Sequence, residues 1–536
     1  MESQKLYLRS NVIAQPLFQG WYAWAYLISP ATAAMNIESR HVKIMQSYIQ
    51  APAIHAAACK DPKMTGGPFM DYGGKRVDEV KALLKSTLEE QGYMVALSQA
   101  IKELTKMLKQ EAKGYSIEAL YEKVPEVLRG YVELFYDLSN APGFRFIEPL
   151  LYHSKYYNDA FQSISLSLID DDHRPFVLST PVLEDADKIS INLPFKSKAL
   201  DEFFSMNRQP KTFEEICHKL KIEVHQKDLF RSFFTEEEPE PYSKYTGEGA
   251  RLRYFGHACL LLETQNLSIL ADPVISYGYD AEVSRYTYGD LPDIIDYVLV
   301  THNHQDHVLL ESLLKLRHRI KNIVIPGGGG GSLQDPSLRL ILESIGFNNV
   351  IELRELETLN LDGLKITGIP FLGEHCDLDI RTKLAHLVEI NNKKILFAAD
   401  SCNIEPNMYR LIHEITGDVD VLFLGMECDG APMSWLYGPL LSEDVPRDKD
   451  HSRRLAGSNY QRGIDIVNRF NFSEVYVYAM GMEPWLKYIM AYEYTDDSNP
   501  IVASNQLLDE CKSKGLRAER LFGEKEILYT TNPVLV

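Results

Sequence analysis

Three histidines and one aspartate crowd into the seven residues THNHQDH at 301–307, directly after an apolar run that predicts a buried strand. Residues two apart in an extended chain face the same way, so His302 and His304 can address one metal ion from one side. As the chain turns toward the next helix, Asp306 and His307 can reach a second ion nearby. Such crowding after a buried strand is costly without a cation, so the pattern predicts a two-metal site.

Length, charge and cysteine usage limit which classes of protein this chain can belong to. The chain has 536 residues, of which 45% are hydrophobic and 24% charged, as is typical of a globular protein. Its net charge of −19 argues against nucleic acid as a partner, because phosphate backbones are held by clustered Lys and Arg. Seven scattered cysteines without a C-x-x-C pair fit a reducing compartment. The apolar stretch at 11–35 is interrupted by polar residues and prolines, so we expect a cytoplasmic protein with no membrane partner.

The sequence changes character near residue 240. Before it, apolar residues recur every three or four positions, as in 77–88 and 93–108, which predicts helices. The acidic, proline-containing stretch at 235–249 resembles a linker, and short apolar strands alternate with amphipathic helices after it. We therefore predict an α/β protein with two domains. A mixed, helix-rich N-terminal domain at 1–246 precedes a layered αββα domain at 247–536, with sites at strand ends.

The histidine motif, preceded by LADP with Asp272, resembles the signature of the metallo-β-lactamase superfamily. The resemblance implies an αββα sandwich with further ligands at later strand ends. Asp400, which ends KKILFAAD, stands where that superfamily places its metal-bridging aspartate. Asp272 would then orient a ligand histidine, although an Asp-Pro turn accounts for this residue equally well.

Two departures from the zinc hydrolases of this superfamily shift the prediction toward iron. Those enzymes usually add one histidine in mid-domain and another late in the chain. The mid-domain position falls in GEHCDLDI at 373–380, where Glu374 and His375 compete, and neighbours on a strand would face opposite ways. The late position falls in YVYAMGMEPW at 476–485, which has no histidine. Carboxylates in place of imidazoles make a site harder and more anionic, which favours iron.

Longer strings carry a more specific resemblance, which covers most of the chain. THNHQDH, GEHCDLDI, FAAD and LGMECDGAPMSWLYGPL, with WYAWAYLISPATAAMNIESRH and GGPFMDY near the N-terminus, closely resemble the diiron β-hydroxylases of nonribosomal peptide biosynthesis, such as that of the chloramphenicol pathway. The resemblance implies that Glu374, rather than His375, reaches the metal. It carries the metal ligands onto His302, His304, Asp306, His307, Glu374 and Asp400.

That family hydroxylates the β-carbon of an amino acid held as a thioester on the phosphopantetheine arm of a nonribosomal peptide synthetase. The resemblance therefore implies a two-iron cofactor, O₂ as co-substrate, an external electron donor and a role in antibiotic biosynthesis. It also implies a homodimer whose N-terminal domain helps dock the thiolation (carrier) domain of the synthetase. Glu374, as a movable carboxylate, and Asp400, as the bridge between the irons, are the residues expected to serve catalysis.

Two other functions stay open at this point. A zinc-dependent hydrolase, such as a lactonase or phosphodiesterase, would attack an ester with a metal-bound hydroxide. A degenerate member would act only as a scaffold or carrier-binding module. The loop at 426–439 is a candidate for lining the substrate pocket or an ordinary packed loop. Glu427, His257 and His375 are candidates for structural roles or places beside the ligands, with Glu427 also a candidate ligand. The residues do not indicate whether the amino acid is aromatic or aliphatic.

Overall fold

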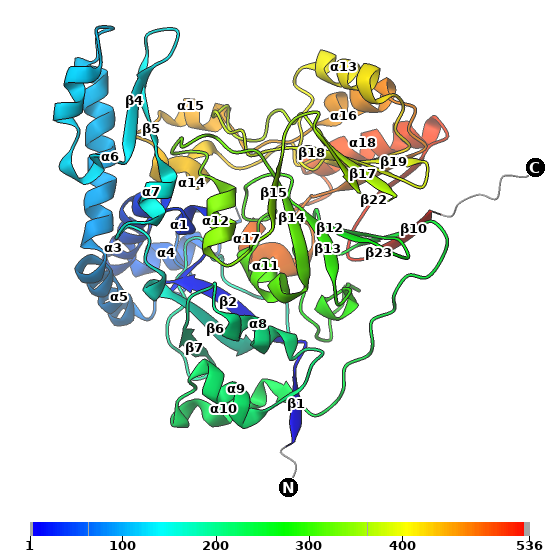
Figure 1. Cartoon of the computed structure of the whole chain (residues 1–536), viewed down its shortest axis with the longest axis horizontal. Helices are drawn as coiled ribbons and strands as arrows, with labels where there is room; N and C mark the ends of the chain where they lie inside the picture. Colours follow the sequence, from blue (N-terminus) through cyan, green and yellow to red (C-terminus); the bar gives the residue numbers. More distant parts are fainter. Residues whose placement is uncertain (1–3, 63, 362, 492, 530–536) are drawn as a thin grey trace, which may run out of the picture.

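After the linker the described residues form two facing sheets of seven strands each (Figure 1). This computed structural model describes residues 4–62, 64–361, 363–491 and 493–529. The predicted strands form because short runs of branched and aromatic residues lie between turn residues, as in the strand IDYVL of Ile295–Leu299. Apolar side chains from both sheets meet in one buried core, which holds the two layers together.

The order of the first sheet is β15 (Val350–Leu353), β14 (Ile320–Pro326), β13 (Ile295–Leu299), β12 (Ser268–Ala271), β11 (Leu260–Glu263), β10 (Ala250–Tyr254) and β23 (Lys525–Tyr529). The order of the second is β16 (Thr358–Leu361), β17 (Leu364–Ile369), β18 (Ala385–Ile390), β19 (Lys393–Phe397), β20 (Val421–Gly425), β21 (Glu474–Tyr478) and β22 (Arg517–Arg520).

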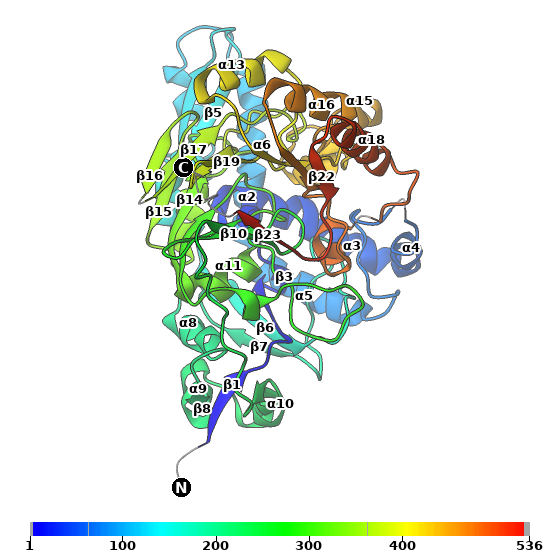
Figure 2. The same cartoon turned by 90° about the vertical axis from the view of Figure 1, so that its right-hand side faces the viewer.

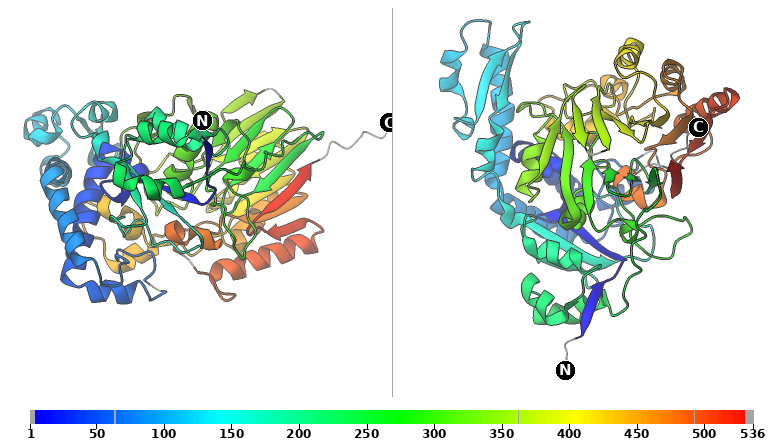
Figure 3. Two further views of the ribbon diagram at one scale, coloured as in Figure 1. Left: turned by 90° about the horizontal axis from the view of Figure 1, so that it is seen from below. Right: turned by 45° about the vertical axis from the view of Figure 1, so that its right-hand side comes forward.

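Helices cover the outer face of each sheet. On the first sheet lie α11 (Leu310–Leu316) and α12 (Leu338–Ser344), and on the second lie α13 (Pro406–Thr416), α16 (Tyr460–Arg469) and α18 (Asn499–Ser513). Figure 3 shows α18, in red, along the outer side of its sheet. The short helices α14 (Met433–Tyr437), α15 (Arg447–Ser452) and α17 (Lys487–Met490) lie in the connections. The αββα layering predicted from the sequence is confirmed.

The N-terminal part is mixed, as predicted. Its strands are β1 (Lys5–Leu8), β2 (Val12–Phe18), β3 (Trp21–Tyr22), β4 (Val132–Tyr136), β5 (Pro142–Phe146), β6 (Gln162–Leu168), β7 (Ile189–Asn192), β8 (Lys211–Thr212) and β9 (Phe234–Thr235). Its helices are α1 (Ala25–Ile28), α2 (Pro30–Asn36), α3 (Lys43–Gln50), α4 (Pro52–Ala58), α5 (Val77–Glu90), α6 (Gly92–Glu111), α7 (Glu148–Tyr152), α8 (Lys198–Ser205), α9 (Phe213–Leu220) and α10 (Lys227–Ser232). A π-helical turn, η1 (Ile37–Val42), joins α2 to α3.

The two parts of the chain share one hydrophobic core. The sheet β3-β2-β6-β7 lies beside α11, and apolar side chains of β2, β6 and α8 pack in the same cluster as those of α11 and α12 (Figure 2). The apolar stretch at 11–35 is therefore buried inside the fold as β2, β3, α1 and α2. Within the described residues, none of the helices has the length and apolar character needed to cross a membrane. The boundary between residues 246 and 247 stays a prediction.

A buried ion pair fastens the N-terminal part to α11. Glu311 is 2% exposed and accepts hydrogen bonds from the guanidinium of Arg174, at 2.8 and 3.2 Å. The hydroxyls of Tyr22 (2.8 Å) and Tyr277 (2.6 Å) donate to the same carboxylate. Arg174 also lies over the ring of Tyr488 at 3.5 Å. Since every partner is buried, loss of one would leave another charge uncompensated.

We therefore expect Glu311→Ala to lower the free energy of unfolding by about 3–5 kcal/mol, because Arg174 would stay buried without its counter-charge. Urea denaturation followed by circular dichroism measures this change. The matched control is Glu343→Ala, which breaks the exposed pair Arg339–Glu343 and should cost less than about 1 kcal/mol. Equal losses in both variants would contradict the structural role given to Glu311.

Candidate metal centre

The predicted ligands follow the carboxyl ends of strands that share one edge of the sandwich. β12, β13 and β14 are parallel, and residues 301–307 leave β13 at that edge. β17 and β19 both run antiparallel to β18, so residue 374 after β17 and residue 400 after β19 emerge on one side. Because strand ends of one direction meet at one edge, residues almost a hundred positions apart become neighbours.

The first group of ligand atoms surrounds the side chain of Glu374. His304 Nδ1 lies 3.0 Å from Glu374 Oε1, and His302 Nε2 lies 3.7 Å from Glu374 Oε2. The same Nε2 is 3.6 Å from Asp400 Oδ2. One ligand atom from each of His302 and His304 lies near the same point, although the chain bends at residues 303 and 304 instead of staying extended.

The second group surrounds His307. Its Nε2 lies 3.0 Å from Asp400 Oδ2 and 3.6 Å from Asp306 Oδ2. Asp400 therefore stands between the two groups, where the sequence places a bridge. The structure brings all six predicted ligand residues together, and each is more than nine-tenths buried. Their role as ligands stays a prediction.

The chemistry of these residues fits two divalent cations. His302 Nε2, Glu374 Oε2 and Asp400 Oδ1 are buried atoms that find no hydrogen-bond partner within the described part of the chain. Such atoms are costly unless a ligand satisfies them. Burial raises the pKa of Glu374 to about 7, so its charged form is disfavoured by the protein alone. A cation would satisfy the orphaned atoms and offset the carboxylate charge.

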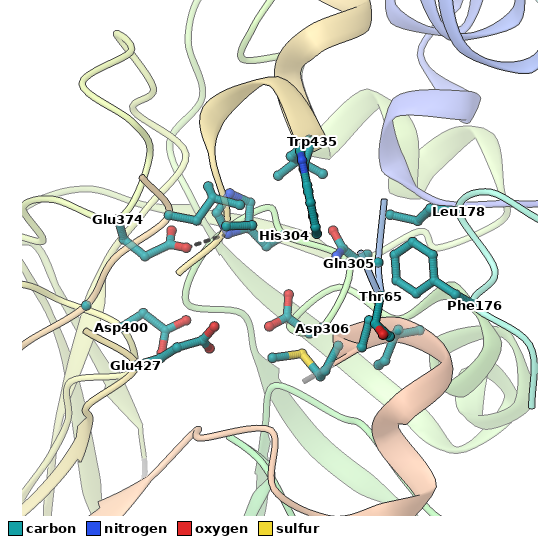
Figure 4. Close-up of a pocket in the computed structure, with 18 residues that line it drawn as sticks. Thr65, Phe176, Leu178, His304, Gln305, Asp306, Glu374, Asp400, Glu427 and Trp435 are labelled. Carbon is teal, nitrogen blue, oxygen red and sulfur yellow. Dashed lines mark ion pairs between the residues drawn. The ribbon is translucent and has the colours of Figure 1, made fainter. Parts of the chain in front are cut away.

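Glu374, and not His375, lines the pocket beside the cluster (Figure 4). The argument from strand alternation was wrong, because β17 ends at Ile369 and residues 373–377 form turns. Glu374 has a left-handed φ of 66°, which lets its side chain and that of His375 lie near the same histidines. Backbone strain of this kind is concentrated at functional sites.

Glu427 is a further acidic group of the pocket. It follows β20 at the same edge, and Figure 4 shows its carboxylate beside Asp400 and across from Asp306. Burial, followed by repulsion from Asp400, Asp306 and Glu374, raises the pKa of Glu427 well above its usual value. With Glu427 included, the cluster has four carboxylates, whose charge two divalent cations would balance. This balance favours Glu427 as an additional ligand over a solvated carboxylate.

Neighbouring side chains fix the orientation of the histidines. Asp272 Oδ2 lies 2.8 Å from His307 Nδ1, and the hydroxyl and amide of Thr301 donate to the Asp272 carboxylate. The hydroxyl of Tyr437 lies 2.8 Å from His304 Nε2, on the side away from Glu374. The orienting contact expected of Asp272 is present, and such contacts set which nitrogen faces a metal.

His257 and Gly425 complete the surroundings of the cluster. His257 Nε2 lies 3.1 Å from Asp306 Oδ2, as expected of a residue placed beside the ligands. Burial would raise the pKa of Asp306, but His307 and His257 lower it below its usual value. A Cβ at Gly425 would lie 2.6 Å from Asp400 Oδ1, so only glycine at this position leaves room for that carboxylate.

Both parts of the chain build the pocket walls. The loop at 426–439 contributes Ala431, Trp435 and Leu436 besides Glu427, so the prediction that it lines the pocket is confirmed. Thr65, Gly66, Phe176 and Leu178 come from the N-terminal part (Figure 4). The sequence alone did not identify these residues, because apolar and small residues carry no local signal of function. The pocket encloses about 90 Å³.

We expect Asp272→Asn to weaken metal binding about 10- to 100-fold, because the amide cannot hold His307 in the same protonation state and orientation. Competition with a chromophoric chelator measures the affinity directly, without an activity assay. Asp418→Asn, an exposed position near α13, is the control and should bind metal like the wild type. Unchanged affinity in Asp272→Asn would contradict the orienting role.

Comparison with known proteins agrees with this geometry. Residues 7–239 match the model of a diiron non-heme β-hydroxylase N-terminal domain, and residues 251–427 match a β-lactamase superfamily domain. The 4-amino-L-phenylalanyl-[CmlP-peptidyl-carrier-protein] 3-hydroxylase of Streptomyces venezuelae is 38% identical over 96% of this chain and 98% of its own length.

The fold of a solved relative agrees over the same length. The crystal structure of CmlA, a diiron β-hydroxylase from Streptomyces venezuelae, superposes with a TM-score of 0.92 and covers 98% of this chain and 100% of that one, at 38% identity. A mutant of CmlA β-hydroxylase gives a TM-score of 0.90, at 37% identity over 98% of this chain and 100% of that one. The clustered histidines and carboxylates, together with this agreement in both parts, lead to one conclusion. The chain belongs to the family of non-heme diiron β-hydroxylases.

Proposed function

We propose that this protein is an O₂-dependent diiron monooxygenase that hydroxylates the β-carbon of an amino acid. The amino acid is held as a phosphopantetheine thioester on the carrier domain of a nonribosomal peptide synthetase. The observation that carries the proposal is 38% identity, over 96% of this chain, with a 3-hydroxylase that acts on an aminoacyl peptidyl-carrier protein. Carbon 3 of an amino acid is its β-carbon. The family membership favours this function over the zinc hydrolase.

The donor set supports iron. We propose that His302, His304 and Glu374 hold one iron and that Asp306 and His307 hold the other, with Asp400 between them. Glu427 is placed to join the second iron, beside Asp400 and opposite Asp306. Three imidazoles with four carboxylates make a harder, more anionic site than the histidine-rich sets typical of zinc, and such sites suit iron.

When bound, the two irons supply the activation of O₂, with electrons from an external donor, and the oxidation of the β-carbon. The residues of the chain position the groups and exclude water. Phe176, Leu178, Leu436, Leu455 and Ile489 give the pocket an apolar lining in addition to the carboxylates. A tethered amino acid would enter such a pocket with its β-carbon toward the metal side, because carrier docking restricts its position.

The partners and location are also proposals. A carrier domain is the partner that the relative's substrate supports. We propose a cytoplasmic location, because the seven cysteines, all inside the described ranges, are free thiols. We also propose a homodimer, for which the chain offers one candidate surface. The arm formed by α6, β4 and β5 projects from the body and exposes Tyr115, Phe135 and Leu138 (Figure 1). Grouped exposed apolar side chains are typical of interaction surfaces.

Metal analysis of protein from iron-replete cells should give two irons per chain and a visible absorption that bleaches on anaerobic reduction. Incubation with O₂, a reductant and aminoacyl-carrier protein should add one oxygen atom to the amino acid, seen by mass spectrometry. Amino acid offered free in solution is the control and should react far more slowly, since it lacks the tether. If the protein contains stoichiometric zinc and no chromophore whatever metal is supplied, the diiron proposal is wrong and a zinc hydrolase is the better assignment.

Light scattering should give twice the mass of one chain if the arm pairs two copies. Phe135→Asp with Leu138→Asp should then yield monomers, because two charges would be buried in the apolar contact. Ile415→Asp on α13, where the side chain is 64% exposed, is the control and should stay dimeric. If the doubly substituted protein is still a dimer, the interface lies elsewhere than on the arm. If the wild type is a monomer, the homodimer proposal is wrong.

A further inference from the structure

A second cavity adjoins the pocket lined by Glu374, Asp400 and Glu427, which we call the metal pocket. The second cavity encloses about 480 Å³ between η1, α3, the loop at 66–69, the segment at 176–179 and α14. Gly66, Phe176, Leu178 and Trp435 line both cavities, so the two spaces share a wall. We call this second cavity the vestibule. Figure 4 shows the ring of Trp435 pointing into the metal pocket, with His304 on one side and Leu178 on the other.

The shared wall is narrow at Gly66. Its φ of +82° favours glycine, and a Cβ there would lie 3.0 Å from Ala491 and 3.4 Å from the ring of Trp435. Any side chain at this position would therefore press on the boundary between the cavities. A slender, unbranched chain is the kind of group that such a junction admits.

The vestibule contains a buried cation without a counter-charge. Arg40 is 8% exposed and lines the cavity. Its Nη2 donates to the carbonyl oxygens of Trp435 (2.6 Å) and Leu436 (3.0 Å), but its Nη1 has no hydrogen-bond partner in the described residues. Over the same residues, Arg40 lies 5.9 Å from the ring of Trp24 but has no acidic side chain as a partner. Burying a charge without a counter-charge is costly. An anion in the vestibule would supply the missing partner.

Lys43 adds a second positive charge at the rim. It lies one turn after Arg40, at the start of α3, and its side chain is exposed. The acidic residue that influences it is Glu38, whose carboxylate is already paired with Lys102. Arg40 and Lys43 together therefore favour an anion in the vestibule, since guanidinium and ammonium groups are typical phosphate ligands.

The two cavities differ in the sign of their charge. The metal pocket presents the carboxylates of Asp306, Glu374, Asp400 and Glu427, so an anionic group on a substrate would be repelled there unless cations intervene. The vestibule presents Arg40 and Lys43 together with a mixed surface from Ser47, Ser179 and Ser434 and from Ile44, Phe69 and Leu178. This difference fits a chain with a phosphate in the vestibule, amides and methyl groups along it, and an uncharged acyl group in the metal pocket.

We propose that the vestibule holds the phosphopantetheine arm, with its phosphodiester at Arg40 and Lys43 and its thioester passing Trp435 into the metal pocket. This inference rests on the proposed function, since it assigns a position to the arm of that substrate. It makes Arg40 and Lys43 positioning residues for the carrier-bound amino acid. Arg40 also donates to the carbonyl of Trp435. The side chain of Arg40 therefore links the proposed phosphate position to a residue that lines the metal pocket.

The test is calorimetric binding of three probes to the iron-loaded, full-length protein: 4′-phosphopantetheine, pantetheine and inorganic phosphate. Wild type should bind phosphopantetheine about tenfold more tightly than pantetheine, because only the former presents the phosphate to both cations. In Lys43→Glu, the ratio of the affinity for phosphopantetheine to the affinity for pantetheine should fall to about one. Lys512→Glu, exposed on α18, is the matched control and should keep the wild-type ratio.

Two results would overturn the inference. Equal affinity of the wild type for phosphopantetheine and pantetheine would show that the protein does not contact the phosphate. Inorganic phosphate that binds as tightly as phosphopantetheine would leave a simple anion site with no role for the arm. Thermal melting of Lys43→Glu, expected to match the wild type at this exposed position, separates lost binding from lost folding.

Failure of the proposed function gives a different pattern. If aminoacyl-carrier protein gains no oxygen but the phosphate-dependent ratio persists, the hydroxylase assignment is wrong and the vestibule still binds the arm. If hydroxylation proceeds with equal rates in Lys43→Glu and Lys512→Glu, and the ratio is one in both, the hydroxylase assignment holds and the vestibule is not the arm site.

Discussion

The structure depends on burying carboxylates and imidazoles together at one edge of a β-sandwich. Asp306, Glu374 and Asp400 are more than nine-tenths buried, and they lie beside His302, whose Nε2 has no hydrogen-bond partner among the described residues. No protein-only arrangement satisfies such a group cheaply, so the cluster is stable as a receptor for cations. The strained φ of Glu374 and the glycine required at position 425 are local costs that keep these carboxylates facing one another.

The N-terminal part is a structural component of the site as well as a candidate for docking. It shares a core with α11 and α12, and the Arg174–Glu311 pair joins it to the helix that directly follows the histidine motif. It also supplies Phe176 and Leu178 to the pocket wall. A sandwich of the same layering without this part would present the cluster to solvent on that side, where water would compete with a tethered substrate.

The proposed path from the vestibule into the metal pocket would account physically for the selection of a tethered substrate. The carboxylates of the metal pocket discourage anionic groups, and the cations of Arg40 and Lys43 attract one in the vestibule. A free amino acid would carry its own carboxylate into the metal pocket and offer nothing to the vestibule. A thioester would remove that negative charge and keep the phosphate outside the metal pocket.

The sequence by itself determined the strand-and-helix order, the αββα layering and the dense cluster of His302, His304, Asp306 and His307, because hydrophobic periodicity and ligand spacing are local properties. The resemblance to a known family added Glu374 and Asp400. Only the tertiary structure decided how these side chains converge, since the chain bends at residues 303 and 304 and Glu374 lies in a bend after β17, where strand alternation does not apply. It also brought Arg40 beside Trp435, 395 positions away, and placed Thr65 and Phe176 in one pocket with residues of the C-terminal part. Such contacts depend on how layers pack, and the free energy of packing is spread over many apolar residues that carry no individual signal.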